Sequence, residues 1–234
     1  MTSIYTIVLV LMQFISLSGE KEISVCSPAE DRVYVQALFN QINDPELNIE
    51  ALAQAIKGYS LMIYKNITSG NQVLTIIDYS LPSDSCRFFI IDVGKGSILY
   101  KSLVAHGRNS GANYAVSFSN RKGSHKSSIG FFVTGETYYG KHGLSLRLKG
   151  LERNINDNAM DRAVVIHAAS YVNEEFVKRY GRLGRSYGCP ALPKENYENI
   201  VNTIKDKTCV FIYYPDRDYL AESEIINCLA CIYR

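Results

Sequence analysis

Residues 73–104 read VLTIIDYSLPSDSCRFFIIDVGKGSILYKSLV and contain three short runs rich in β-branched and aromatic residues. These runs, 73–79, 88–93 and 97–104, are separated by LPSD and by GKG. Apolar runs bounded by Gly, Pro and Asp are typical of strands. The GKG tripeptide is too short for a phosphate-binding loop and predicts a hairpin turn. The stretch therefore predicts a β-sheet.

Further strands are predicted along the chain. Residues 129–134 (IGFFVT) form one run, and LSLRL (144–148) alternates strictly, which predicts a half-buried strand with its leucines facing inward. The runs AVVIH (163–167) and TCVFIYY (208–214) are almost continuously apolar, as in central strands. A single helix is predicted among these late strands, beginning near Pro193, because Pro is tolerated at a first helical position. Its buried stripe comprises Tyr197, Ile200, Val201 and Ile204.

Residues 27–66 are predicted to form a helical N-terminal segment. Val33, Leu38 and Ile42 recur at near-helical spacing, and Asp44-Pro45 breaks the pattern. Asn48 can cap a second helix. The apolar stripe of that helix comprises Leu52, Ala55, Ile56 and Tyr59. With the strands, this predicts a mainly β fold with a few helices.

Length and charge limit the function classes. The 234 residues suit one domain with a small appendage, and they can bury a sizeable core. A net charge of +2 and the lack of a long Lys/Arg cluster argue against nucleic acid as a partner. No nucleotide-binding, metal-binding or cofactor motif occurs in the sequence. We therefore expect a globular protein without a cofactor.

The first 20 residues resemble a secretory signal peptide. Residues 4–16 are strongly apolar but too short to span a membrane, and small residues follow them. No Lys or Arg precedes the run, so a buried N-terminal helix is the alternative. The signal-peptide interpretation predicts an exported protein of the periplasm or cell envelope, not membrane-spanning once the signal is removed.

Six cysteines in an exported protein raise the question of disulfides. If Cys189 is a free nucleophile, an odd number remains, so one or two bridges are open and the pairing is not determined. No further ligand pair completes a zinc site with the C-terminal CxxC, which favours packing or a terminal disulfide. The remaining cysteines are Cys26, Cys86, Cys209, Cys228 and Cys231.

The motif RSYGCP (185–190) presents a cysteine on a glycine turn, and His167 ends an apolar run 22 residues upstream. A thiolate is a strong nucleophile, and a nearby imidazole can take its proton. Gly188 lets the backbone turn sharply and is predicted to offer an oxyanion-binding N–H. An inert buried thiol and a structural core histidine are the alternatives from this spacing alone.

Several collinear segments of the chain resemble the L,D-transpeptidase (YkuD-like) superfamily, and most closely its murein L,D-transpeptidase catalytic domain branch. The resemblance covers roughly residues 73–216. It implies a mostly β sandwich catalytic domain over 73–216, followed by a C-terminal tail, 217–234. The segments include VAHGR (104–108), SSIG (127–130), TGETY (134–138), KHGLSL (141–146), GLE (150–152) and GRLGRSYGCP (181–190).

The resemblance implies three catalytic groups. Cys189 would be the nucleophile, His167 the general base, and the backbone carbonyl of Ala168 the group that fixes the imidazole tautomer. Two departures from the superfamily motif concern substrate register. Tyr187 stands where the motif has His, and Pro190 follows the cysteine where an apolar residue is common.

Further residues are expected to bind substrate. Arg182 and Arg185 flank Gly184 just before the cysteine turn, and guanidinium groups suit the free carboxylates of a peptidoglycan stem peptide. A solvated loop or internal ion pair is their alternative. The other candidates are Ser186 and Tyr187 in the turn, and His106 and His142, which precede glycines in loops. His125 is expected to be exposed and idle.

The predicted function is a cysteine acyltransferase of the bacterial cell envelope, an L,D-transpeptidase that acts on peptidoglycan stem peptides through a thioester on Cys189. An L,D-carboxypeptidase or endopeptidase using the same site is one alternative, in which water replaces the acceptor amine. A non-catalytic peptidoglycan-binding domain is another, although such a domain needs neither His167 nor Cys189. A thiol peptidase that acts on proteins is a third.

Overall fold

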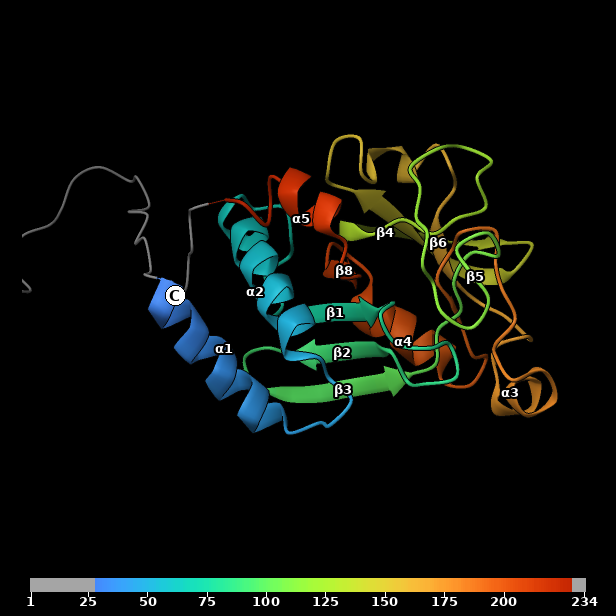
Figure 1. Ribbon diagram of the computed structural model, residues 1–234, viewed down its shortest axis with the longest axis horizontal. Coiled ribbons are helices and arrows are strands. Elements are labelled where there is room, and N and C mark those ends of the chain that lie inside the picture. Colours follow the sequence, from blue (N-terminus) through green and yellow to red (C-terminus); the bar gives the residue numbers. More distant parts are fainter. Residues whose placement is uncertain (1–27, 229–234) are drawn as a thin grey trace, which may run out of the picture.

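A computed structural model describes residues 28–228 of the chain. Two helices lead into a long sheet, and shorter helices lie between and after the later strands (Figure 1). The α-helices are α1 (Pro28–Ile42), α2 (Ile49–Tyr64), α3 (Glu174–Tyr180), α4 (Tyr197–Ile204) and α5 (Arg217–Glu222), and a 3-10 turn, η2, spans Asp157–Ala159.

The eight described strands form one hydrogen-bonded sheet in the order β3-β2-β1-β8-β4-β5-β6-β7. The pairs β1–β8 and β6–β7 are parallel, and the other neighbours are antiparallel. The mainly β fold with a preceding helical segment is therefore confirmed. The strands are β1 (Val73–Asp78), β2 (Phe88–Asp92), β3 (Ser97–Ser102), β4 (Gly130–Gly140), β5 (Gly143–Gly150), β6 (Val165–Ala168), β7 (Ala191–Leu192) and β8 (Cys209–Tyr213).

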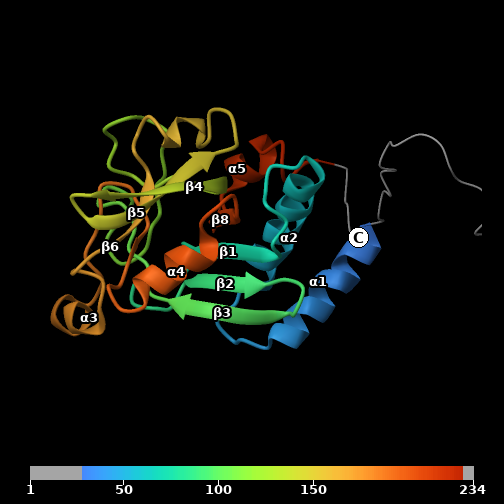
Figure 2. The ribbon, with the colours of Figure 1, turned by 180° about the vertical axis from the view of Figure 1, so that it is seen from behind.

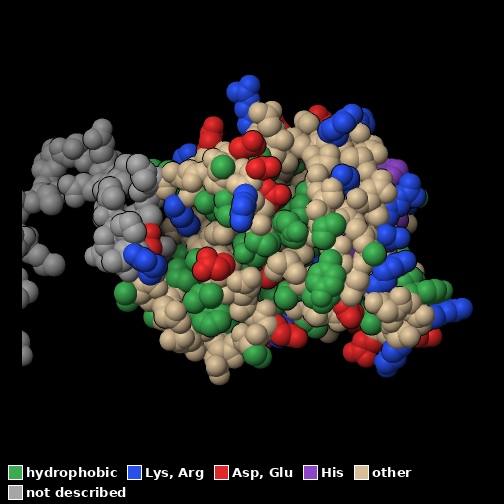
Figure 3. Space-filling view, in the orientation of Figure 1, with side chains coloured by type: hydrophobic (Ala, Val, Ile, Leu, Met, Phe, Trp, Pro, Cys, Tyr) green, Lys and Arg blue, Asp and Glu red, His purple; other side chains and the backbone are tan. Residues whose placement is uncertain are grey.

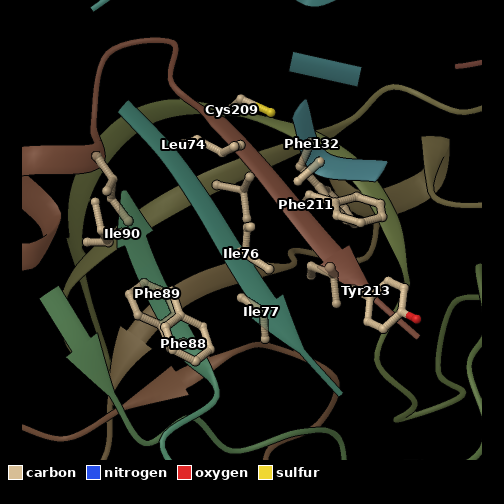
Figure 4. Packing of buried hydrophobic residues seen from close by; sticks show 14 of the residues in the cluster. Leu74, Ile76, Ile77, Phe88, Phe89, Ile90, Phe132, Cys209, Phe211 and Tyr213 are labelled. Carbon is tan, nitrogen blue, oxygen red and sulfur yellow. The ribbon is translucent and has the colours of Figure 1, made fainter. Parts of the chain in front are cut away.

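The core lies around the middle of the sheet, where β1 and β8 are buried on both faces. Helix α2 packs against both strands, and α4 packs against β1 from the other side, as the front and back views show (Figures 1 and 2). Side chains of β1, β2, β4 and β8 pack together there (Figure 4). Double-sided cover explains why these strands have continuous apolar runs instead of alternation.

Helix α2 forms as its sequence predicts. The side chain of Asn48 accepts hydrogen bonds from the backbone N–H groups of Glu50 and Ala51, so it caps the helix. The whole predicted apolar stripe is buried. Gly58 faces Phe131 so closely that an added Cβ would lie 2.1 Å from the ring, and this permits tight packing of α2 on β4.

Two helices differ from the sequence prediction. Helix α4 starts at Tyr197 instead of near Pro193, with Asn196 in the left-handed region (φ 56°) as its N-cap, although the predicted stripe is buried. Helix α3 is absent from the sequence prediction, because it is only seven residues long and none of its residues is buried. Its signals were the terminal residues: Asn173 caps the N-terminus and Gly181 (φ 68°) ends the helix.

Residues 217–228, expected to belong to a C-terminal tail, pack on the domain. Asp216 caps α5, and Tyr219 and Ser223 are buried. Both hydroxyls donate to the carboxylate of Glu152, which also accepts the backbone N–H of Phe131 at 2.7 Å. Burial raises the pKa of Glu152. The segment after β8 therefore closes over a buried polar network.

The predicted signal peptide, residues 1–20, lies outside the described residues. Over residues 28–228, no helix has the length and apolar character needed to cross a bilayer. The thiols of Cys86, Cys189, Cys209 and Cys228 are free, while Cys26 and Cys231 lie outside the described residues.

Candidate active site

Strand β6 carries His167, and the short strand β7 follows the cysteine turn. The two strands pair in parallel, with His167 opposite Ala191, two residues after Cys189. The backbone N–H of His167 also donates to the carbonyl of Pro190 at 3.4 Å. Pairing of these strands therefore joins the two segments that the sequence separates by 22 residues.

Cys189 and His167 line one cleft of about 1010 Å³. Its wall contains five lysine or arginine side chains and two histidines but no carboxylate among the residues that the structure describes. Lys and Arg side chains gather on the side of the molecule where α3, β5 and β6 lie (Figure 3). The lining residues are Arg108, Tyr138, Gly140, Lys141, His142, Ser145, Arg162, Ala163, Val165, His167, Tyr171, Phe176, Arg182, Gly184, Arg185, Ser186, Tyr187 and Cys189.

The cysteine turn is held by a close set of contacts. Gly188 has φ 125°, and a Cβ there would lie 2.8 Å from the carbonyl oxygen of Lys126, so the position requires glycine. The hydroxyl of Ser186 accepts the Gly188 N–H at 3.0 Å and donates to the carbonyl of Cys189 at 2.6 Å. Ser127 Oγ donates to the Gly188 carbonyl at 3.2 Å. The turn is therefore fixed from both sides.

These contacts alter the expected oxyanion donor. The Gly188 N–H already donates to Ser186, and the Ser186 N–H donates to the carbonyl of His106 at 2.9 Å. Within residues 28–228, by contrast, the N–H of Cys189 has no hydrogen-bond acceptor. The described turn residues with a free backbone N–H are therefore Tyr187 and Cys189, because the side chain of Ser186 occupies the N–H of Gly188.

The thiol of Cys189 is half-buried and points toward the carbonyl of Ala163, with 3.6 Å between Sγ and O. Burial raises the pKa of the Cys189 thiol above its ordinary value. A hydrogen bond from the Val165 backbone and the charges of Arg162 and Lys141 oppose that effect. The resting group is accordingly a thiol at neutral pH.

The imidazole of His167 is 3% exposed, and its Nδ1 lies 2.9 Å from the carbonyl oxygen of Ala168. A carbonyl only accepts, so Nδ1 carries the proton and Nε2 keeps its lone pair. Burial lowers the pKa of His167, the Ala168 hydrogen bond opposes this, and positive charge on His142 and Lys141 lowers the pKa further. The resting imidazole is therefore neutral.

This resting pair, a thiol and a neutral imidazole, differs from the thiolate–imidazolium ion pair that is expected when an imidazolium lies beside a cysteine. Desolvation penalises both charged forms, because burial raises the pKa of Cys189 and lowers that of His167. Proton transfer between them then has to accompany substrate binding or attack.

His142 lies at the turn between β4 and β5, beside Gly143, which has φ 78°. Its ring stacks on that of His167, with 4.4 Å between centroids and 21° between planes. The sequence analysis predicts a cleft position for His142, and the side chain does line the cleft.

Arg162 is a cleft residue that sequence reasoning missed. Its guanidinium donates to the carbonyls of Ser119 and Lys126 and to the hydroxyl of Ser128, and so ties residues 119–128 to the start of β6. Burial lowers the pKa of Arg162, and the negative form of Cys189 would raise it. The one sequence signal was its place directly before the apolar run that ends in His167.

Three arginines lie together at the cleft: Arg108, Arg182 and Arg185. Burial lowers the pKa of Arg185, and the positive charges of Arg182 and Arg108 lower it further. Arg185 donates to the carbonyl of Gly111 at 2.8 Å, whereas no described carboxylate forms a salt bridge with any of the three. The cluster therefore has unused donors and uncompensated charge.

Tyr187 lies at the rim of the cleft and is 65% exposed. Its ring stacks beneath the guanidinium of Arg108, 4.7 Å from the centroid, and lies 4.6 Å from the ring of His125. Arg108 Nη2 is also 3.1 Å from His125 Nδ1. His125, expected to be idle, thus takes part in a surface stack.

His106 does not reach the cleft, so its predicted contact with substrate is corrected. Its side chain is completely buried, and its Nδ1 lies 2.8 Å from Nη2 of Arg87. Burial and the charge of Arg87 lower the pKa of His106 to about 3, so Nδ1 accepts the guanidinium proton. His106 is a structural histidine. Over residues 28–228, no three His, Cys, Asp or Glu side chains are grouped as a metal site.

Comparison with known proteins assigns the family. The profile of the L,D-transpeptidase catalytic domain matches residues 43–213, which is well over half of the chain. The chain belongs to this family. The resemblance stated from the sequence is confirmed. The match begins before α2, so the family domain includes that helix.

No curated protein sequence matches the chain. Among solved structures, it is similar to an L,D-transpeptidase from Mycobacterium smegmatis (14% identity, TM-score 0.38, 61% of this chain and 59% of that one). It is also similar to L,D-transpeptidase 3 from Mycobacterium tuberculosis in complex with a faropenem-derived adduct (11% identity, TM-score 0.40, 61% of this chain and 60% of that one). For an L,D-transpeptidase from Stackebrandtia nassauensis, the identity is 9% and the TM-score 0.36, and the match covers 87% of this chain and 99% of that one. The chain thus spans about 60% of the two mycobacterial proteins.

Proposed function

We propose that the protein is a cysteine acyltransferase that acts on peptidoglycan stem peptides as an L,D-transpeptidase. The observation that carries the proposal is that the thiol of Cys189 and the imidazole of His167 share a single cleft, with His167 Nδ1 held on a backbone carbonyl. That carbonyl has the orienting role of a triad carboxylate without its charge. Family membership supports the same reaction class.

In the acylation half, His167 Nε2 takes the thiol proton as Cys189 Sγ attacks the carbonyl carbon of the L,D-amide. The oxyanion forms near the free N–H of Cys189, in a turn already fixed by Ser186 and Ser127. The tetrahedral intermediate collapses as the imidazolium gives its proton to the departing amine. A D-amino acid leaves, and the peptide remains as a thioester on Sγ.

In the second half, an acceptor amine attacks the thioester carbonyl, and His167 Nε2 takes a proton from it. Collapse breaks the C–S bond, and the imidazolium returns its proton to the sulfur. Water in place of the amine gives hydrolysis, the carboxypeptidase or endopeptidase outcome. Both outcomes use the same residues.

The arginine cluster supports a substrate with free carboxylates. Arg182 and Arg185 line the cleft with donors that no described side-chain carboxylate uses. Guanidinium groups bind carboxylates through paired, charge-assisted hydrogen bonds. A stem peptide that carries carboxylates on its diamino acid fits this requirement. Export to the periplasm or cell envelope, as the N-terminal sequence predicts, would bring the enzyme to that substrate.

The test is mass spectrometry of the intact protein after incubation with a purified tetrapeptide muropeptide. We expect an added mass equal to the donor without its terminal D-amino acid, located on Cys189, with release of that D-amino acid. Cys86→Ala is the matched control, because Cys86 is another half-buried free thiol that does not line the cleft. Adduct on Cys86, or none on Cys189 despite turnover, would reject the assignment.

A further inference from the structure

The β4–β5 hairpin covers the general base proposed above. Its turn residue His142 is exposed, whereas His167 beneath it is 3% exposed, and the two rings stack at 4.4 Å and 21°. His142 comes from a different segment than His167 and Cys189, and β5 pairs with β6 so that Ser145 lies opposite His167. The sheet therefore brings a second imidazole onto the face of the first.

We propose that His142 is a positioning residue: its ring holds the plane of the His167 imidazole against the Ala168 carbonyl and disfavours a proton on it. The proposal rests on the proposed function, since His167 matters as a base only if Cys189 reacts. It assigns to the hairpin turn a part in the acid–base step instead of a contact with substrate.

Two contacts are needed to orient the ring. The hydrogen bond from Nδ1 to the Ala168 carbonyl holds one edge of the ring and opposes torsion about the Cβ–Cγ bond. The face contact with His142 opposes the same torsion from the side of the ring plane, so Nε2 keeps one direction. A nucleophile and base displaced by about 1 Å can lose on the order of a hundredfold in rate. Orientation is thus worth protecting with a second contact.

The electrostatic part follows from what surrounds His167. The hairpin offers Tyr138, Lys141 and His142 to the cleft, the start of β6 offers Arg162, and the loop before α3 offers Tyr171. The cysteine loop adds Arg182, Arg185, Tyr187 and Cys189, with Arg108 beyond. None of these described groups is a carboxylate. An imidazolium at His167 therefore has no carboxylate counter-ion among them.

The lack of a carboxylate counter-ion affects both proton transfers. A neutral His167 is available as a base at pH values where an ordinary histidine is partly protonated. Once it has taken the thiol proton, the imidazolium is a stronger acid than usual and gives the proton readily to the departing amine. The stacked His142 strengthens this behaviour without touching the substrate.

The experiment compares His142→Phe, which keeps a planar ring but no ionisable nitrogen, with His142→Ala, which has neither. The control is Tyr139→Ala, a neighbour on the same hairpin that is 80% exposed and does not line the cleft. The chain has only four histidines, so ¹⁵N NMR titration of the resting protein can follow His167 individually. Turnover of tetrapeptide muropeptide gives kcat and KM for each variant.

In His142→Ala we expect the pKa of His167 to rise, its tautomers to mix, and kcat to fall about tenfold with KM within about twofold. In His142→Phe the ring position is kept, so kcat at high pH stays near wild type, while the His167 pKa still rises because a phenyl face favours a cation. Tyr139→Ala should match wild type in both measurements.

An unchanged His167 titration together with an unchanged kcat in His142→Ala would overturn the proposal, and so would a loss confined to KM, which would make His142 a substrate contact. The titration uses the resting protein and does not depend on turnover. A failure of the thioester test on Cys189 would therefore reject the proposed function while leaving the measured effect of His142 on His167 readable.

Discussion

The protein buries two histidines in two different settings, and the comparison separates a structural group from one that borders the candidate active site. His106 is enclosed and accepts a hydrogen bond from Arg87, and burial with that charge lowers its pKa to about 3. His167 is almost as buried, but its Nδ1 donates to a carbonyl and its ring borders the cleft. Burial and a lowered pKa are common to both, so neither property identifies the base. What distinguishes His167 is that its ring lines the same cleft as the thiol of Cys189.

The largest effect should come from removing that thiol. Cys189→Ala is expected to abolish acyl transfer while changing the free energy of unfolding by less than about 1 kcal/mol, because a half-buried side chain in a hydrogen-bonded turn contributes little packing. Muropeptide turnover and urea unfolding on the same preparations measure both. Residual turnover at the wild-type rate would remove the reason to treat His167 differently from His106.

The pH dependence should be the next largest effect. Since burial lowers the pKa of His167, its neutral form persists below the ordinary value of about 6.5, and kcat/KM should fall only at more acidic pH. Since burial raises the pKa of Cys189, the resting thiol should alkylate slowly at pH 6 and speed up only above the ordinary thiol range.

His167→Ala tests whether Cys189 and His167 are both neutral in the resting protein. We expect it to stop turnover with little change in the alkylation midpoint of Cys189, because the resting pair carries no ion pair to lose. Rapid alkylation at pH 6 that disappears in His167→Ala would instead indicate a thiolate–imidazolium pair and contradict the neutral resting state.

The middle of the sheet could be predicted from the sequence, and much of the cleft could not. Strands β1 and β8 can be recognised in the sequence because burial on both faces requires continuous apolar runs. The start of α2 can be recognised from its capping residue, Asn48. Helix α3 has no buried residue, so the periodicity of apolar residues does not predict it. Cys189 and His167 could be proposed from motif chemistry and family resemblance.

The remaining site features depend on contacts between distant segments. The stack of His142 on His167, the contacts of Arg162 with residues 119–128, and the occupation of the Gly188 N–H by Ser186 all arise only after the strands pair. The sequence can single out the residues, but local spacing does not predict which distant groups they contact. The burial of His106 is of the same kind, since it requires Arg87 from another strand end.

His106 should matter for stability and not for the chemical step. Its pKa is lowered in the folded state, so the unfolded chain binds the extra proton. Stability is then complete above about pH 6.5 and lost as pH falls toward 3, at up to about 1.4 kcal/mol per pH unit.

In His106→Phe the guanidinium of Arg87 loses an acceptor, which costs about 2 kcal/mol at pH 7, and the slope between pH 6.5 and 3 becomes shallower. Denaturant unfolding across this range measures the difference from wild type, and kcat of the folded protein should be unchanged. A slope identical to wild type would mean that His106 takes up no proton on unfolding.

The smallest effect concerns the arginines of the two regions. Arg87 donates hydrogen bonds to the carbonyls of Val104 and Leu81 and to His106. Arg182 makes one described hydrogen bond, to the Leu183 carbonyl, so its other N–H donors are free. If those free donors bind a substrate carboxylate, Arg182→Ala should raise KM about tenfold or less and leave kcat nearly unchanged, since the contact is made equally in ground and transition states.

The matched control for this measurement is Lys178→Ala, which removes an exposed cation from the nearby helix α3 whose ion-pair distance to Glu174 is 3.9 Å. Amidation of the substrate carboxylate sharpens the test, because it should weaken binding to wild type but not to Arg182→Ala. Equal losses of affinity for Arg182→Ala and Lys178→Ala would show that only the net charge of this side matters. The arginines at the cleft would then resemble Arg87 in having no partner in the substrate.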